Sequence, residues 1–406
     1  MKEIYFDHAA TTYVRDEVMD SMNEYFQNEY GNPGSFHTVG FRNKKVVQHS
    51  RETIKDILNA KSPKEIIFTG SGTESVNLAI KGLTQKYDTG HIITSTIEHE
   101  AVLETLYYLE HKKGFEVTKV PVDKYGVVNP EDVKDAIKEN TILVTIMYAN
   151  NEIGTIQPIE EIGKICKDKK VTFHTDACQA GGLLDLDVQK LNVDLLTLNG
   201  SKIYGPKGIG LLYKRSMIKL IPLIHGGGQE FGMRSGTENV PFIVGFTKAL
   251  ELGQLERKEE SDRLLKLRTL LEEGILNNIP KTFLNGHPTS RLVNNFNVTI
   301  ADIEGEAMML LLNEYGICAS SGSACTSHTL EPSHVILSLG LPYEVAHGTL
   351  RLTLGKKTTE EDIQKIVDVL PDVVERLRKI SPVIVDMDTI DVCKYVPKEM
   401  INAKLS

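Results

Sequence analysis

The sequence predicts an α/β fold whose large domain contains a mostly parallel, seven-stranded sheet. Short, almost purely apolar runs alternate with amphipathic helical stretches over residues 14–256. Because these runs lack the polar alternation of a half-exposed strand, they indicate strands buried on both faces, as in a parallel sheet covered by helices. The runs are EIIF, HIIT, FEVTKV, TILVTIMYA, VTFHTDA, VDLLTL and GIGLLY.

A smaller α+β domain is expected to follow, formed by residues 257–406 together with residues 1–13. A helical segment near residues 259–278 precedes the strand-like VNNFNVTI, the helical EGEAMMLLLNEYG and the strand-like TLRLTLG. A run of helices and strands without βαβ alternation is typical of an α+β unit. We therefore expect the domain boundary near residue 256.

The last long helix is predicted to begin at Thr358, because Thr358-x-x-Glu361 has the form of a capping box. From about Pro382 the sequence loses clear periodicity. We interpret this final stretch as a docking tail or a loosely held terminus.

Composition and charge restrict the classes of function. The chain has 406 residues, a net charge of -9 and a pI near 5.8, with basic and acidic residues mixed throughout. This balance gives no electrostatic footprint for nucleic acid or an anionic membrane. The N-terminal MKEIYFDHAATT has no apolar signal core, and the apolar run at residues 141–149 is shorter than half a bilayer span. We expect a cytoplasmic protein that binds neither nucleic acid nor membranes directly.

The five cysteines indicate neither a disulfide framework nor a zinc site, because they are odd in number, widely spaced and free of any C-x-x-C pattern. Cys325 is unusual among them. It lies in SSGSACTSHTLEPS, a loop-forming run that offers little packing for a side chain that is normally buried. If the Cys325 thiol has a function, that function is chemical reactivity and not packing.

Polar clusters follow several strands, at the sheet edge where α/β proteins bind ligands. In FTGSGTESVN, the residues Gly70 to Thr73 separate a strand from a helix expected to begin at about Glu74. Glycines that allow close backbone approach, followed by free N–H groups at a helix start, make a phosphate cradle. A plain glycine-rich turn is the alternative, because the run matches neither G-x-G-x-x-G nor a P-loop.

Two further strand ends carry ionisable groups. Asp176, in HTDACQAGG, ends a buried strand, where a carboxylate needs a cation or several donors. A hydrogen-bonded structural Asp is the alternative. Lys202, in LNGSKIYGPKGIG, is either an exposed loop lysine or a buried one whose lowered pKa leaves an amine able to react with an aldehyde.

Together, the phosphate cradle, the carboxylate and the amine match the needs of pyridoxal 5'-phosphate. Asn150 and Asn151, in YANNEIG, add donors and acceptors suited to the phenolic oxygen of that cofactor. His99, in STIEHEAV, could stack on a flat ring and move protons, although a lone His at this place is also typical of a helix cap.

The ordered motifs resemble the cysteine desulfurases of the NifS/IscS type, which are fold-type-I pyridoxal phosphate enzymes. The resemblance extends over nearly the whole chain, through YFDHAATT, YGNPGS, GSGTESVNLAIKG, EHEAV, NNEIG, HTDACQ, SKIYGPKGIG, GGGQEFGMRSGTEN, SSGSACTSHTLEPS and RLTLG. It implies that Lys202 binds the cofactor aldehyde, that Asp176 pairs with the pyridine nitrogen, and that Gln179 and Asn151 bond the phenolic oxygen. His99 would stack on the ring and assist proton transfer.

The resemblance also assigns the anion-binding residues. Gly72 and Thr73 would hold the phosphate, and Thr237 would reach the phosphate of a neighbouring subunit, which implies a homodimer with shared sites. Arg351 would bind the substrate carboxylate, with Asn151 beside it, a task suited to a planar guanidinium.

The same resemblance explains why Cys325 lies in a loop-forming run. We infer that Lys202 removes the Cα proton of L-cysteine and that the Cys325 thiolate attacks the substrate sulfur, which gives L-alanine and a persulfide on Cys325. A loop over about residues 319–333 would let the thiol travel, and His99 or the substrate would deprotonate it. The wording SSGSACTS resembles the long-loop group that supplies iron-sulfur scaffold proteins and tRNA thiolation enzymes. Cys318 is expected to be a buried core cysteine.

The chain departs from the family before the lysine. The usual Ser-x-His is replaced by Asn199 and Ser201, so a ring donor to the phosphate is absent. One charge-assisted hydrogen bond contributes about 1.5–3 kcal/mol, so we expect cofactor affinity to be lower by about tenfold or more. A Ser201→His variant that binds the cofactor no more tightly would contradict this expectation.

Two alternatives remain open at this level. A catalytically idle paralogue acting as a binding partner would show no cofactor absorption band. The second alternative is another enzyme of the same fold, such as a selenocysteine lyase or an aminotransferase. An aminotransferase would not need Cys325.

Overall fold

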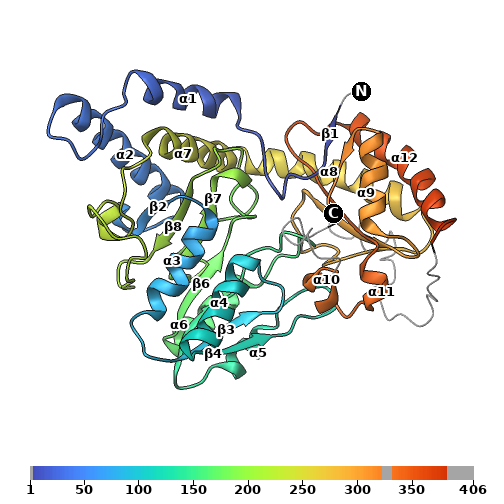
Figure 1. Ribbon diagram of the computed structural model, residues 1–406, viewed down its shortest axis with the longest axis horizontal. Helices are drawn as coiled ribbons and strands as arrows, with labels where there is room; N and C mark the ends of the chain where they lie inside the picture. The colour runs from blue at the N-terminus through green and yellow to red at the C-terminus, as the bar shows by residue number, and fades with distance from the viewer. Residues whose placement is uncertain (1–2, 322–331, 382–406) are drawn as a thin grey trace.

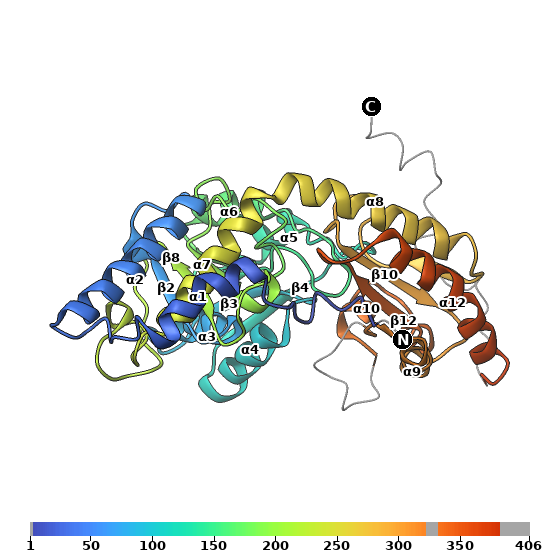
Figure 2. The same ribbon diagram turned by 90° about the horizontal axis from the view of Figure 1, so that it is seen from above.

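The computed structural model describes residues 3–321 and 332–381, which form a larger and a smaller lobe (Figure 1). Figure 2 shows the long helix α8 running from the larger lobe along the smaller one. A seven-stranded sheet forms the centre of the larger lobe, in the order β2-β8-β7-β6-β5-β3-β4. Its strands are β2 (Ile66–Thr69), β3 (His91–Ser95), β4 (Glu116–Val120), β5 (Thr141–Thr145), β6 (Thr172–Asp176), β7 (Leu195–Asn199) and β8 (Gly210–Lys214).

The sheet is mostly parallel, as the apolar runs predict. β8 pairs antiparallel with both β2 and β7, whereas the other neighbours pair in parallel. β2 therefore has the same direction as β7, and six of the strands end at one edge. The prediction of burial on both faces is wrong for β4, because it is an edge strand and most of its residues are at least partly exposed.

Helices cover both faces of this sheet and form two apolar cores. One face packs against α1 (Asp16–Gln27), α2 (Thr38–Ile57), α5 (Pro130–Ala136), α6 (Ile159–Lys169) and α7 (Val240–Leu255). The other face packs against α3 (Gly72–Thr84) and α4 (Glu100–Lys113). Alternate strand residues point to opposite faces, so Ile66 enters the first core and Ile67 the second.

The smaller lobe is α+β. Its three-stranded antiparallel sheet, in the order β12-β10-β9, packs with long helices around a separate apolar core. A parallel two-stranded sheet, β1-β11, joins the N-terminal segment to this lobe. The elements are β1 (Ile4–Tyr5), α8 (Arg257–Leu276), β9 (Thr282–Leu284), β10 (Asn295–Ile300), α9 (Gly305–Glu314), β11 (Ile317–Cys318), β12 (Thr349–Thr353) and α12 (Glu360–Arg378).

The capping box of α12 lies one residue later than predicted. The hydroxyl of Thr359 accepts from Asp362 N, and the carboxylate of Asp362 accepts from Thr359 N. Thr358 instead accepts from Gly355 N in the preceding turn (2.9 Å), which is why it cannot cap the helix. The tail after residue 381 lies outside the described residues, and the boundary near residue 256 stays a prediction.

Two short helices, α10 (His334–Ser338) and α11 (Tyr343–Ala346), lie below the smaller lobe in Figure 1, with α10 nearer the larger lobe. Val335 and Ile336 of α10 share an apolar cluster with Ile97 and Met147, which follow strands of the large sheet. The smaller lobe therefore packs on the edge where those strands end. Within the described ranges, no helix combines the length and apolar character needed to cross a bilayer.

Candidate active site

A cavity of about 170 Å³ lies at the edge where the parallel strands end. β3, β5, β6 and β7 all end beside it, which is the usual ligand position in an α/β sheet. The N-terminal segment and the smaller lobe complete its wall. Its lining includes Ala9, Ala10, Gly72, Thr73, Glu98, His99, Met147, Asn151, Glu152, Asp176, Cys178, Gln179, Asn199, Lys202, His334 and Arg351.

Lys202 enters this cavity from a short 3-10 turn, Gly200–Lys202, that directly follows β7. Its Nζ donates to the carbonyl oxygens of Ala9 (2.7 Å) and Ala10. The alternative of an exposed loop lysine therefore does not hold, because the side chain is held against the N-terminal segment.

Asp176 is the last residue of β6 and only 8% exposed. Its Oδ1 accepts from Cys178 N at 2.9 Å, so Asp176 does make the kind of hydrogen bond expected of a structural Asp. Its position in the cavity lining shows that the carboxylate also faces the site. Gln179 lies beside it and donates from Nε2 to Ala9 O at 3.0 Å.

The start of α3 forms the anion cradle. The helix begins at Gly72, earlier than the predicted Glu74, because the Ser71 side chain accepts from Glu74 N and caps it. A Cβ at Gly72 would lie 2.9 Å from Cys178 Sγ and 3.2 Å from Asn199 Cβ. Only glycine lets the first amides of this helix come so close to the neighbouring loops.

His99 is both a helix cap and a cavity residue. Its Nδ1 accepts from Ala101 N at 3.0 Å at the start of α4. The neutral imidazole must therefore carry its proton on Nε2, a tautomer assigned from the hydrogen bond.

Arg351 lies on β12 and is 2% exposed. Its guanidinium donates to Asp7 Oδ1 at 2.7 Å and to Asn151 O at 3.2 Å. The backbone of Arg351 also exchanges hydrogen bonds with Ser320, so the segment that leads to the predicted cysteine loop begins beside the guanidinium. Asp7 was not predicted from the sequence, although it lies within the motif YFDHAATT.

Two buried carboxyl groups of the cavity were also missed. Burial raises the pKa of Glu98 to about 8, although its Oε1 accepts from Ser95 Oγ (2.6 Å) and Met147 N (3.0 Å). Burial likewise raises the pKa of Glu152, whose Oε2 accepts from Ser333 Oγ at 2.5 Å. Their position next to His99 and Asn151 in the sequence is the only signal that could have identified them.

His334 is a second histidine of the cavity, contributed by the smaller lobe. Its Nε2 lies 3.0 Å from Glu98 O, and because a carbonyl only accepts, this nitrogen must carry a proton. The residue was not singled out from the sequence.

Four predicted residues are not placed at the cavity. Cys325 lies outside the described residues. Asn150 is fully buried, and its side chain binds backbone groups instead. Thr237 is exposed in the loop before α7, and Ser201 is half-buried within the lysine turn, with its N–H donating to Asn199 Oδ1. Asn199 does line the cavity. The roles of Thr237 and Ser201 toward a phosphate stay predictions.

The described cysteines are poor nucleophiles. Burial raises the pKa of the Cys166 thiol to about 12 and that of Cys178 well above its ordinary value. Cys318 was predicted to be a buried core residue, but it is half-buried. It belongs to a two-residue strand in which Ile317 is the side chain that enters the core.

These groups fit pyridoxal 5'-phosphate. An amine, a carboxylate at a strand end and the first turn of a thirteen-residue helix face one cavity, and the close packing at Gly72 leaves backbone amides to meet an anion. Among residues 3–321 and 332–381, no cluster of His, Cys, Asp and Glu is arranged to hold a metal ion.

Comparisons with known proteins agree with this site. The Aminotransferase class-V family model matches residues 4–366. A cysteine desulfurase IscS of Methanosarcina thermophila is 54% identical over 383 residues, 94% of each chain. A cysteine desulfurase IscS of Clostridium botulinum strain Hall is 50% identical over 385 residues, 94% of this chain and 96% of the other.

Solved structures are similar over most of the chain. A NifS-like protein has a TM-score of 0.87 at 38% identity, covering 93% of this chain and all of that one. A structure described as SspA in complex with cysteine has a TM-score of 0.77 at 39% identity, covering 87% of this chain and 99% of the other.

Proposed function

Since the chain belongs to the class-V aminotransferase family, we infer that it is a pyridoxal phosphate-dependent cysteine desulfurase, which removes sulfur from L-cysteine and passes it to acceptors. The observation that carries this conclusion is the meeting of Lys202, Asp176, the start of α3 and Arg351 at one cavity. When bound there, the cofactor supplies an electron sink that weakens bonds at the substrate Cα.

We propose that Lys202 holds the cofactor aldehyde and moves the proton at the substrate Cα, and that Asp176 pairs with the pyridine nitrogen. Gln179 and Asn151 would orient the ring through its phenolic oxygen. His99 would cover the ring and donate from Nε2, because its Nδ1 is engaged at the cap of α4. A buried carboxylate such as Asp176 favours a cationic partner, which supports this arrangement.

The phosphate would lie at the start of α3, against Gly72 and Thr73, with Asn199 beside them. The positive end of the helix and its free amides stabilise an anion there. We keep Ser201 and Thr237 as further phosphate-binding residues in this proposal, the second of them from a neighbouring subunit.

Arg351 would bind the substrate carboxylate. A guanidinium that is 2% exposed is little screened by water, and its bond to Asp7 aligns it toward the cavity. Cys325 would then take the sulfur as a persulfide and release L-alanine. The partners we propose for sulfur delivery are iron-sulfur scaffold proteins or tRNA-thiolation enzymes.

We further propose a cytoplasmic homodimer. Phe36 is 94% exposed and Tyr30 is 76% exposed, and large exposed aromatic side chains mark interaction surfaces. The exposed loop of Thr237 is bound to α2, the helix that follows these aromatic residues, because Glu230 of this loop binds Arg51 of α2 at 2.6 Å. We also propose residues 14–256 as one domain, and residues 1–13 with 257–406 as the other.

Sulfide release from L-cysteine in the presence of a reductant tests the function. We expect release by the cofactor-loaded protein and none by Cys325→Ala, with the cofactor absorption band present in both. Equal release by both proteins would contradict the role of Cys325, and inactivity of the loaded parent protein would contradict the substrate.

A further inference from the structure

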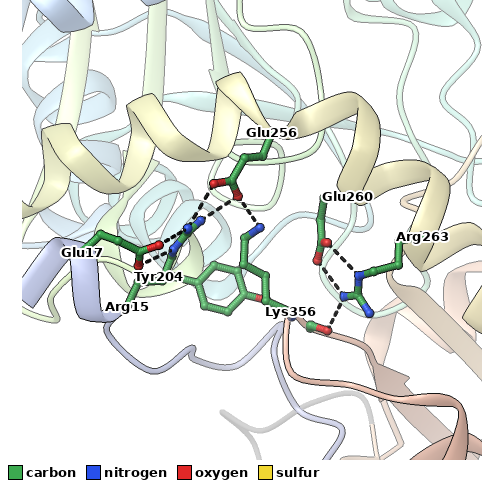
Figure 3. Close-up of polar contacts among 8 residues, drawn as sticks. Arg15, Glu17, Tyr204, Glu256, Glu260, Arg263 and Lys356 are labelled. Carbon is green, nitrogen blue, oxygen red and sulfur yellow. Dashed lines mark hydrogen bonds and ion pairs between the residues drawn. The ribbon is translucent and has the colours of Figure 1, made fainter.

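One carboxylate, Glu256, lies where the two lobes meet. α7 ends at Leu255 and α8 begins at Arg257, so Glu256 occupies the junction between them (Figure 3). It accepts from Arg15 Nη1 at 2.7 Å and Nη2 at 3.1 Å, and from Lys356 Nζ at 2.5 Å. Arg15 precedes α1 of the larger lobe, whereas Lys356 follows β12 of the smaller lobe. A single side chain therefore ties both lobes to the helix junction.

Tyr204 makes a second tie between the lobes. Its hydroxyl accepts from Lys356 N at 3.0 Å, its N–H donates to Thr12 Oγ1 at 2.8 Å, and its carbonyl accepts from Arg15 N at 3.2 Å. Its φ is +63°, a left-handed conformation that a bulky side chain adopts only when the surrounding structure imposes it. The bonds to the N-terminal segment and to the turn after β12 supply that constraint.

Both ties lie a short distance along the chain from the reactive groups. Tyr204 follows Lys202 by two residues, and Lys356 follows Arg351 by five residues. β12 is a regular strand paired along its length with β10, and the chain runs from Arg351 on this strand directly into the turn that carries Lys356. Both ties therefore hold a turn that is continuous with the strand of Arg351.

Glu256 stays charged at neutral pH. The hydrogen bond from Arg15 lowers the pKa of Glu256 to about 2, against a smaller effect of burial. The side chains of Arg15, Lys356 and Glu256 are 11%, 21% and 29% exposed. Because the loss of hydration offsets much of the attraction in a largely buried ion pair, fixed geometry is a better explanation of this arrangement than stability.

We propose that Glu256 and Tyr204 are positioning residues that hold Arg351 at a fixed distance and orientation from Lys202. Neither residue touches the substrate; each acts through Lys356 and β12. The inference rests on the proposed function, in which Lys202 carries the cofactor and Arg351 binds the substrate carboxylate.

The test compares two ligands of the cofactor-loaded, full-length protein by titration of its absorption spectrum. L-alanine carries the carboxylate that Arg351 would bind, and L-alaninamide lacks it. The variants are Glu256→Gln and Tyr204→Phe, which keep side-chain shape. Glu17→Gln is the matched control, because Glu17 also binds Arg15 (2.7 Å) but makes no hydrogen bond to Lys356. Arg351→Lys tests the assignment of the guanidinium itself.

We expect Glu256→Gln and Tyr204→Phe to weaken L-alanine binding about tenfold and to leave L-alaninamide binding within twofold of the parent, because a small misplacement of a positioned group is costly. Glu17→Gln should change the binding of neither ligand.

If Glu256→Gln and Tyr204→Phe weaken the binding of both ligands equally, the residues have a general structural role and the inference is wrong. If L-alanine binding is unchanged while Arg351→Lys weakens it, the function stands and the positioning role fails. If Arg351→Lys spares the preference for L-alanine, the carboxylate assignment fails, and this inference with it.

Discussion

At the residue scale, burial and hydrogen bonding decide the charge of a carboxyl group, and Glu98 and Glu65 show opposite outcomes. Glu98 is fully buried, and its Oε2 has no hydrogen-bond partner among the described residues, so burial raises its pKa to about 8. Glu65 is 1% exposed, and although burial raises its pKa, the hydrogen bonds from Ser216 and from backbone amides lower it overall.

This difference predicts how stability depends on pH. Between the ordinary pKa of 4.5 and the raised value of about 8, folded Glu98 holds a proton that the unfolded chain releases. Glu98 therefore favours the folded state fully below pH 4.5, and this contribution is lost as pH rises to 8. We expect Glu98→Gln to reduce the fall in midpoint temperature of thermal unfolding between pH 5.5 and pH 8.

Glu65→Gln is the control for this measurement. The pKa of Glu65 is lowered, so its contribution is present above pH 4.5 and lost only in more acidic solution. The variant should lower the midpoint temperature by the same amount at pH 5.5 and pH 8. An unchanged pH dependence in Glu98→Gln would show that its carboxyl is ionised across this range.

At the element scale, the position of the start of α3 depends on Gly72, which has no side chain. A Cβ at Gly72 would approach Cys178 Sγ to 2.9 Å, closer than real contacts allow, so either the helix start or the loop after β6 would have to move. That loop begins at Asp176. A change at the start of α3 is therefore expected to displace Asp176 as well.

We expect Gly72→Ala to weaken cofactor binding at least tenfold and to cost about 1–3 kcal/mol of stability from overpacking. The measurement is the affinity of the cofactor-free protein for pyridoxal 5'-phosphate. Cys178→Ala alone should bind the cofactor normally, and Gly72→Ala combined with Cys178→Ala should recover part of the loss. Failure of the double variant to recover any affinity would place the clash elsewhere.

A helix or strand was predicted well where one sequence pattern marks it, and poorly where two possible capping patterns compete for its start. Each apolar run corresponds to a strand of the large sheet. The start of α12 was misplaced by one residue, because Thr358 and Thr359 both have acidic residues three positions later. Only the hydrogen bond of Thr358 to Gly355 excludes the first of them.

At the scale of the whole molecule, the proposed homodimer would explain why large aromatic side chains such as Phe36 are exposed on the larger lobe. We expect Phe36→Asp to shift the protein toward monomer in sedimentation velocity and to weaken cofactor retention, because a buried aspartate carboxylate opposes association. Leu310→Asp is the control, since Leu310 is 72% exposed on α9 of the smaller lobe. A dimer that tolerates Phe36→Asp would place the interface elsewhere.

The sequence by itself determined the α/β fold and identified Lys202 and Asp176 as candidate cofactor-binding groups, because strand periodicity and residue chemistry are local properties. The tertiary structure decided what those groups meet. Asp7 lies 344 residues from Arg351 along the chain but binds it at 2.7 Å, and Arg15 meets Glu256 across 241 residues. Such pairs, like the raised pKa of Glu98, arise only when distant segments pack and exclude water, which local sequence patterns do not record.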